Sequence, residues 1–121
     1  MRLAVVGAGA VGTSVVELAG EYGHEIVAVA DSSSGAVDEG GLHVDEILSR
    51  KREQGVVGDG TPADVLEAEY DVLVEATPTT LGDAEPGFSH VERALERDRH
   101  VVLANKGPVA ERYEEIRALE A

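Results

Sequence analysis

The chain has no cysteine and no tryptophan, and aromatic residues make up only 3% of it. The absence of cysteine excludes disulfides and thiolate metal sites, and it fits the reducing environment of the cytoplasm. Hydrophobic residues nevertheless make up 43% of the 121 residues, so the chain has enough apolar side chains to fold. We therefore expect a core of Val, Leu, Ile and Ala, a composition that suits a buried parallel sheet.

Basic side chains are also scarce. The chain carries 24 acidic and 10 basic residues, which gives a net charge of −14. Such a surface repels nucleic-acid phosphates and anionic lipids, so we expect neither partner. The acidity has two interpretations: a surface that keeps the protein soluble, or an adaptation to a high-salt cytoplasm. The second is favoured because Lys51 and Lys106 are the only lysines.

Long apolar runs are absent too. No segment has the length of a membrane span, and the N-terminus lacks the pattern of a signal peptide. These absences predict a soluble cytoplasmic protein.

Short apolar strands alternate with helical patterns along the whole chain, which predicts a single domain over residues 1–121. The predicted strands are Arg2–Val6, Glu25–Ala30, Asp71–Glu75 and His100–Ala104. The predicted helices are 11–19, Val44–Gln54, 61–68 with Thr61 as N-cap, Phe88–Arg97 and Ala110–Ala121, while 35–41 reads as a polar loop. The alternation predicts an α/β fold of the Rossmann type: a doubly wound, mostly parallel sheet with helices on both faces.

A glycine motif, Gly7-Ala8-Gly9-Ala10-Val11-Gly12, joins the first strand to the first helix. In this strand–turn–helix setting Gly7 allows a tight turn, Gly9 lets a pyrophosphate approach the backbone, and Gly12 lets the helix pack against the strand. Ala10 and Val11 lie where this turn meets the helix and are expected to contact the cofactor, because the free N–H groups and dipole of the helix N-terminus attract phosphate. The motif therefore predicts a dinucleotide site.

Asp31 ends the second strand, 19 residues after Gly12. A carboxylate at this place can accept hydrogen bonds from the adenosine ribose, which favours NAD. The alternative is an Asp that caps its own loop by bonding the following serine amides. NADP also stays open, because Ser32 to Ser34 can bond a 2′-phosphate and Lys51 or Arg52 can reach over it.

Two further loops follow the ends of predicted strands. Ala76-Thr77-Pro78 and Asn105-Lys106-Gly107 lie at the edge where open α/β sheets bind ligands. We expect them to line the nicotinamide half of the cofactor. The four histidines have no metal-ligand spacing, so no metal is expected; they read as surface or strand-end residues, and the scattered glutamates as a solvated face.

Three stretches together resemble homoserine dehydrogenase: Asp71-Val-Leu-Val-Glu-Ala-Thr-Pro-Thr79, Glu85-Pro-Gly87 and His100-Val-Val-Leu-Ala-Asn-Lys-Gly-Pro108. The resemblance covers nearly the whole chain. It implies NAD(P)-dependent interconversion of L-homoserine and L-aspartate 4-semialdehyde, in threonine and methionine biosynthesis. It also implies that Lys106 is catalytic, since an ammonium beside the nicotinamide can stabilise or protonate the alkoxide formed from an aldehyde.

Members of that family continue into a domain that binds the substrate. The resemblance thus implies an isolated cofactor domain without turnover, which meets homoserine or aspartate semialdehyde only together with that second domain. Two alternatives stay open: a stand-alone module that senses redox state through a protein partner, and the cofactor domain of another dehydrogenase of amino-acid metabolism.

Overall fold

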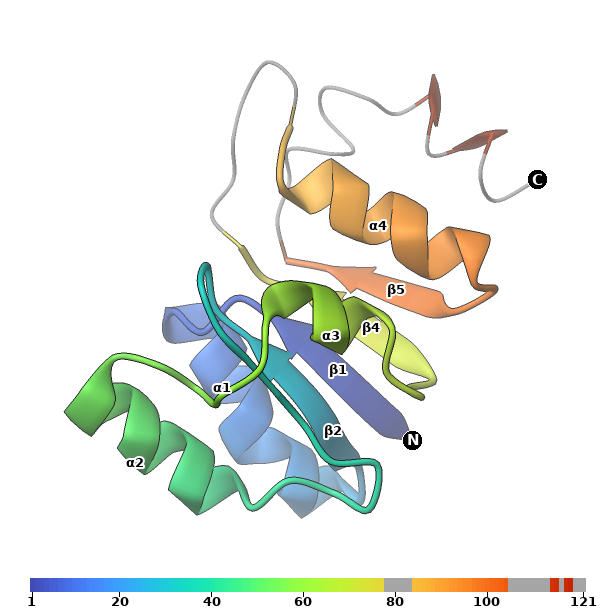
Figure 1. The fold of residues 1–121 in the computed structure, drawn as a ribbon. Helices are drawn as coiled ribbons and strands as arrows, with labels where there is room; N and C mark the ends of the chain where they lie inside the picture. The colour runs from blue at the N-terminus through green and yellow to red at the C-terminus, as the bar shows by residue number, and fades with distance from the viewer. Residues whose placement is uncertain (78–83, 105–113, 116, 119–121) are drawn as a thin grey trace.

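A computed structural model of the chain describes residues 1–77, 84–104, 114–115 and 117–118. Its centre is one five-stranded sheet with the strand order β3-β2-β1-β4-β5 (Figure 1). The strands are β1 (Arg2–Val6), β2 (Glu25–Ala30), β3 (Gly35–Val37), β4 (Val72–Glu75) and β5 (His100–Leu103). The helices are α1 (Ala10–Ala19), the 3-10 turn η1 (Gly20–Tyr22), α2 (Val44–Gln54), α3 (Pro62–Leu66) and α4 (Gly87–Glu96).

The predicted α/β architecture is confirmed. β1 pairs in parallel with β2 and β4, and β4 pairs in parallel with β5. The helix that starts at Pro62 has the predicted cap, because the Thr61 hydroxyl accepts from the Asp64 N–H and the Asp64 carboxylate accepts from the Thr61 N–H. The predicted helix Ala110–Ala121 falls mostly outside the described residues.

One strand differs from the prediction. The segment 35–41 was expected to be a loop, but its first three residues form β3, which pairs antiparallel with β2. A segment of only three residues, one of them glycine and one alanine, has no periodic pattern of its own. Its strand conformation therefore depends on pairing with β2. Its fit is close: a side chain on Gly35 would place its Cβ 2.3 Å from the carbonyl oxygen of Thr61.

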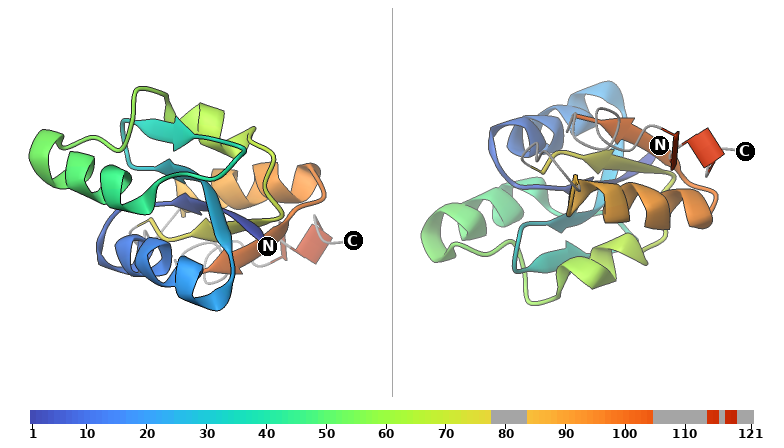
Figure 2. Two further views of the ribbon diagram at one scale, coloured as in Figure 1. Left: turned by 90° about the horizontal axis from the view of Figure 1, so that it is seen from below. Right: turned by 90° about the horizontal axis from the view of Figure 1, so that it is seen from above.

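The core lies on both faces of the sheet, and helices cover each face (Figure 2). On one face Val5 and Val29 pack with Val16 of α1 and with the partly buried Ile47 of α2. On the other face Val65 of α3 and Ala94 of α4 pack with strand residues that include Ala4, Val27 and Leu73. Burial of this kind contributes about 1.5–3 kcal/mol for each large aliphatic side chain.

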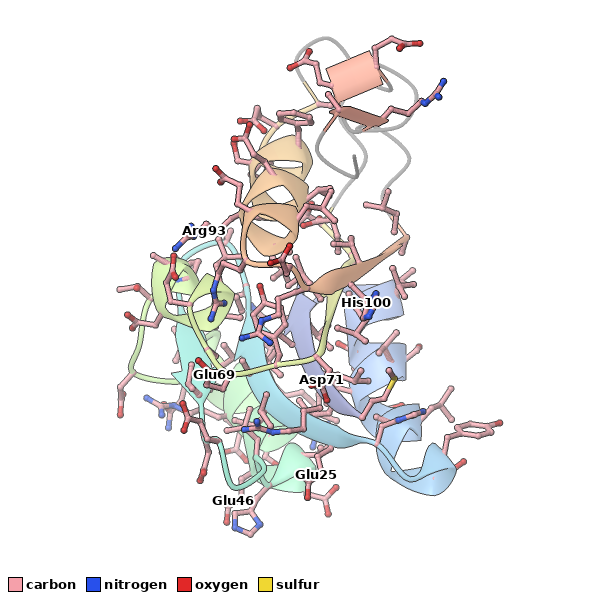
Figure 3. All side chains as sticks on the ribbon, turned by 90° about the vertical axis from the view of Figure 1, so that its right-hand side faces the viewer. Glu25, Glu46, Glu69, Asp71, Arg93 and His100 are labelled. Atoms are coloured by element: carbon pink, nitrogen blue, oxygen red, sulfur yellow. The ribbon has the colours of Figure 1, made fainter. Side chains whose placement is uncertain are left out.

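The surface carries the acidic excess. Glu25, Glu46 and Glu69 are exposed and lie on the outside of the fold (Figure 3). Two apolar residues of α1, Val11 and Leu18, are about half exposed. In the part of the chain that the structure describes, no helix has the length and hydropathy needed to cross a membrane.

Candidate functional site

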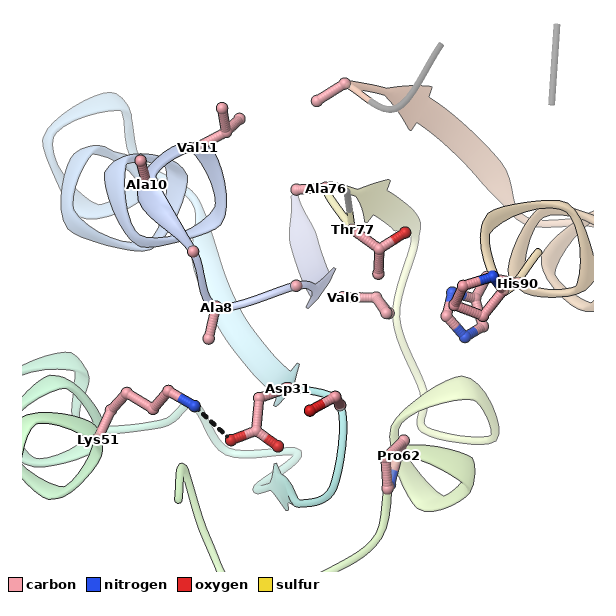
Figure 4. A pocket seen from close by; sticks show the side chains of 15 residues that line it. Val6, Ala8, Ala10, Val11, Asp31, Lys51, Pro62, Ala76, Thr77 and His90 are labelled. Atoms are coloured by element: carbon pink, nitrogen blue, oxygen red, sulfur yellow. Dashed lines mark hydrogen bonds and ion pairs between the residues drawn. The ribbon is translucent and has the colours of Figure 1, made fainter. Parts of the chain in front are cut away.

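A cavity of about 890 Å³ lies at the carboxyl ends of the central strands (Figure 4). Segments far apart in the sequence meet there, because parallel strands all end at the same edge of the sheet. The cavity is lined by residues of β1 and the turn after it, the start of α1, the segment after β2, helices α2, α3 and α4, and the segments that follow β4 and β5. These residues are Val6, Gly7, Ala8, Gly9, Ala10, Val11, Asp31, Ser32, Lys51, Pro62, Ala76, Thr77, Pro86, His90 and Ala104.

The glycines of the motif have three different roles. Gly7 has a φ of +108°, and its N–H donates to the Ala30 carbonyl at 2.8 Å. A Cβ on Gly7 would lie 2.5 Å from the Ala76 carbonyl carbon, and a Cβ on Gly12 would lie 1.7 Å from the Gly7 oxygen. Gly9 differs, because a Cβ there would meet nothing within 4 Å. The fold itself therefore requires glycine at 7 and 12, whereas the space at Gly9 is left open.

That open space faces the beginning of α1. Gly9 is the N-cap, and Ala10 and Val11 line the cavity in the first helical turn. The first N–H groups of a helix have no partner within the helix, and they carry the positive end of its dipole. No acidic side chain occupies this first turn. The place is thus suited to an anionic group such as a pyrophosphate.

Asp31 lies at one end of the cavity and its side chain is almost fully buried, 5% exposed. Its Oδ1 accepts from the Ser33 N–H at 2.9 Å and from the Ser34 N–H and hydroxyl at 2.6 and 2.8 Å. Its Oδ2 accepts from the Lys51 ammonium at 2.7 Å (Figure 4). The loop-capping role considered for Asp31 is therefore present, and only Oδ2 faces a cationic partner.

Burial by itself would raise the pKa of Asp31, but the hydrogen bonds from Lys51, Ser33 and Ser34 hold that pKa well below its ordinary value. The carboxylate is consequently ionised throughout the neutral range. Of the two cations considered near a 2′-phosphate, Lys51 lines the cavity, whereas Arg52 is exposed and donates to Ser49. Ser34 is buried, and its hydroxyl accepts from the Val57 N–H, so among the three serines Ser32 is the one at the cavity wall.

The predictions that Glu75 and His90 are surface residues are wrong. Glu75, the last residue of β4, was read as part of a solvated face, but it has no exposed surface. His90 on α4 was read as a surface or strand-end residue, yet its side chain is only 13% exposed and its Nδ1 lies 2.6 Å from Glu75 Oε2. The prediction was wrong because the partner of Glu75 is His90, which lies on another element, α4, 15 residues further along the chain. A glutamate that directly follows the buried run Val72-Leu73-Val74 was the one available signal.

The other predicted site residues divide into three groups. Gly7, Gly9, Ala10, Val11, Asp31, Ser32, Ala76 and Thr77 line the cavity. Gly12 packs behind the turn, against Gly7. Pro78, Asn105 and Lys106 lie outside the described residues, so their part in the site stays a prediction. Among the described residues, no group of three or more potential ligands is placed to hold a metal ion.

Comparison with known proteins gives the family. Residues 1–81 match the sequence model of a family described as Glutamate/Leucine/Phenylalanine/Valine dehydrogenase. Homoserine dehydrogenase of Methanocaldococcus jannaschii is 32% identical over 133 residues, which cover 96% of this chain and 40% of the relative. NAD(+)-dependent homoserine dehydrogenase of Pseudomonas canavaninivorans is 32% identical over 137 residues, which cover 98% of this chain and 39% of the relative. The chain thus spans about two fifths of the curated relatives that it matches.

A solved structure agrees with these relatives. Homoserine dehydrogenase of Thermoplasma acidophilum superposes with a TM-score of 0.87 at 28% identity, over 98% of this chain and 39% of that one. The resemblance to homoserine dehydrogenase is confirmed, and with it the dinucleotide-binding fold. The chain therefore belongs to the Glutamate/Leucine/Phenylalanine/Valine dehydrogenase family, and it is an NAD(P)-binding domain similar to that of homoserine dehydrogenases.

Proposed function

We propose that this domain binds NAD(P) for the interconversion of L-homoserine and L-aspartate 4-semialdehyde. One observation carries the proposal: the cavity joins the open N-terminus of α1, where Gly9 leaves room for phosphate, to the loop ends that follow β4 and β5. A dinucleotide needs such a continuous site, with its pyrophosphate at the helix and one nucleoside on either side.

In the proposed reaction, a hydride passes from the carbinol carbon of homoserine to the nicotinamide ring and the hydroxyl proton leaves, which yields the aldehyde and NAD(P)H. In the reverse direction the aldehyde oxygen gains negative charge as the hydride arrives. Lys106 is proposed to stabilise or protonate that oxygen, because an ammonium beside a developing alkoxide lowers the barrier. This role rests on the resemblance of the Asn105-Lys106-Gly107-Pro108 stretch.

We further propose that the 121 residues bind cofactor but do not turn over homoserine by themselves. The chain spans about two fifths of the relatives, and the groups that hold a small substrate are expected in the rest of such a protein. Steady homoserine oxidation by the purified chain would contradict this part of the proposal.

For the adenosine end we propose a preference for NAD, with Asp31 Oδ2 accepting from the ribose. Lys51 limits this preference, because its ammonium lies 2.7 Å from the same oxygen and can also attract a 2′-phosphate. Replacing Asp31 is then expected to weaken NAD more than NADP, and replacing Lys51 with Met is expected to weaken NADP more than NAD.

The test is a calorimetric titration of the chain with NAD, NADH, NADP and NADPH, repeated with Asp31→Ala and Lys106→Ala. The proposal predicts saturable binding of one cofactor per chain, with Lys106→Ala changing affinity less than Asp31→Ala. Failure of all four cofactors to bind the folded chain at millimolar concentration would overturn it.

A second candidate is the cofactor domain of a different amino-acid dehydrogenase. The family model favours it, since its description names glutamate, leucine, phenylalanine and valine and its match ends at residue 81. The Asn105–Pro108 stretch lies beyond that match and supports homoserine instead. Activity of the whole protein with homoserine, compared with those four amino acids, separates the candidates.

A further inference from the structure

A buried carboxylate and an imidazole lie together at the end of β4, on the other side of β1 from Asp31, and the imidazole lines the cavity. Glu75 has no exposed surface, and its Oε1 accepts from the N–H of Thr77 at 2.9 Å and from the Thr77 hydroxyl. Its Oε2 lies 2.6 Å from Nδ1 of His90. Figure 4 shows the His90 ring reaching from α4 towards Thr77.

The contact with Glu75 determines how His90 can act. Where Glu75 is ionised, its Oε2 only accepts, and Nδ1 of His90 then carries the ring proton and donates it to Glu75. Nε2 is then the remaining polar atom of the ring, and it has no bonding partner among the residues that the structure describes. Because His90 lines the cavity, Nε2 is available to bond a ligand there.

The cavity that His90 lines is largely apolar. Its lining includes Val6, Pro62, Ala76 and Pro86. A flat ring fits such a wall by van der Waals contact, and Nε2 adds one directional hydrogen bond. Small-ligand sites commonly combine an apolar lining with a few polar groups that fix orientation.

The order of groups along the cavity assigns the ring. The strand order β2-β1-β4 gives that order: Asp31 follows β2, the glycine turn that leads into α1 follows β1, and Glu75, which contacts His90, ends β4. If the adenosine ribose lies at Asp31 and the pyrophosphate at α1, as the proposed function requires, the nicotinamide lies near His90. Its carboxamide has an N–H₂ donor and a carbonyl acceptor, so it can bond Nε2 whether the imidazole is neutral or protonated.

We propose that His90 Nε2 hydrogen-bonds the nicotinamide carboxamide, and that Glu75 is the positioning residue that holds the ring for it. This inference rests on the proposed function. Glu75 acts through its Oε2 contact with Nδ1, and by bonding Thr77 it also holds the turn that borders the cavity.

The test compares NAD⁺ with ADP-ribose, which contains the adenosine, both phosphates and the second ribose but no nicotinamide. In the unchanged protein NAD⁺ is expected to bind more tightly than ADP-ribose. His90→Ala is expected to reduce that advantage about threefold to tenfold, the worth of one hydrogen bond, while the affinity for ADP-ribose stays the same. Glu96→Ala, an exposed change on the same helix, is the matched control and is expected to alter neither affinity.

A second measurement uses 3-acetylpyridine adenine dinucleotide, in which a methyl group replaces the amide nitrogen. At a pH where the ¹⁵N spectrum shows a neutral His90 ring, Nε2 accepts and the analogue offers it no donor. The unchanged protein should therefore prefer NAD⁺ to the analogue, and His90→Ala should lose that preference. Glu75→Gln should shift the ring proton partly from Nδ1 to Nε2 in the same spectrum and lower the preference.

The outcomes separate this inference from the proposed function. Failure of ADP-ribose and NAD⁺ alike to bind the unchanged protein overturns the proposed function. Binding of both, with an NAD⁺ advantage that His90→Ala leaves intact, overturns the inference alone. An equal loss for both ligands in His90→Ala also overturns it, since His90 then supports the fold rather than the nicotinamide. An unchanged ring tautomer and NAD⁺ preference in Glu75→Gln overturn the positioning role.

Discussion

The replacement Gly12→Ala is expected to destabilise the protein severely although it adds only a methyl group. The added Cβ would lie 1.7 Å from the Gly7 carbonyl oxygen, half of the 3.4 Å at which ordinary van der Waals contact begins. That oxygen cannot retreat easily. The N–H of Gly7 is bonded to Ala30, and Gly7 itself packs closely against the Ala76 backbone. The start of α1 must therefore move away from β1 by more than 1 Å.

Overpacking against movable side chains costs about 1–3 kcal/mol, so a clash with fixed backbone should cost at least about 3 kcal/mol. For a total stability of about 5–15 kcal/mol this is a large loss. With a urea dependence of about 1.5 kcal/mol per molar, the unfolding midpoint should fall by about 2 M.

The assay is urea unfolding followed by circular dichroism, with Gly20→Ala as the control. Gly20 has helical dihedral angles, and a Cβ there meets nothing within 4 Å. This replacement should raise stability by about 0.4–1 kcal/mol, because alanine restricts the unfolded chain. A Gly12→Ala midpoint within about 0.3 M of the unchanged protein would refute the packing argument.

Three further predictions concern stability. Asp31→Asn should lower the free energy of unfolding by about 1–3 kcal/mol at pH 7. Because folding lowers the pKa of Asp31, the stability that its carboxylate contributes is present above the unfolded pKa near 4 and is lost as the pH falls below that value. The urea midpoints of the two proteins should therefore converge in acid, and a gap that stays constant with pH would contradict this prediction. Leu73→Ala, at a fully buried position of β4, should cost about 2–5 kcal/mol, whereas Leu18→Ala, at a position 48% exposed, should cost much less in the same assay. With a net charge of −14, the thermal midpoint should rise from 0.1 to 2 M KCl, and a flat response would rule out adaptation to high salt.

The sequence predicted those parts of the fold that depend on local patterns. Apolar runs such as Val72-Leu73-Val74 form buried strands in any sheet of this kind, and Thr61 with Asp64 forms a cap within four residues. The strand β3 could not be predicted in the same way, because Gly35 and Ala36 gain their strand conformation by pairing with β2.

In the candidate site, too, local patterns were predicted and long-range contacts were not. The glycine motif and Asp31 were found because their spacing along the chain is itself the signal. The contact between Glu75 and His90 depends on how α4 packs beside β4, which local patterns do not specify. The ion pair of Asp31 with Lys51 joins residues 20 apart, and the sequence suggested Lys51 only as a cation for a 2′-phosphate, not as the partner of Asp31.

The central claim is that the cavity at the glycine turn holds the dinucleotide, and Gly9→Ala tests it most directly. Because a Cβ on Gly9 meets no protein atom within 4 Å, the change should alter unfolding by less than about 1 kcal/mol. The methyl group would occupy the space proposed for the pyrophosphate, so calorimetry should show NAD⁺ and ADP-ribose binding at least about tenfold more weakly, a loss of about 1.4 kcal/mol. A folded Gly9→Ala protein that binds both ligands as tightly as the unchanged chain would contradict the claim.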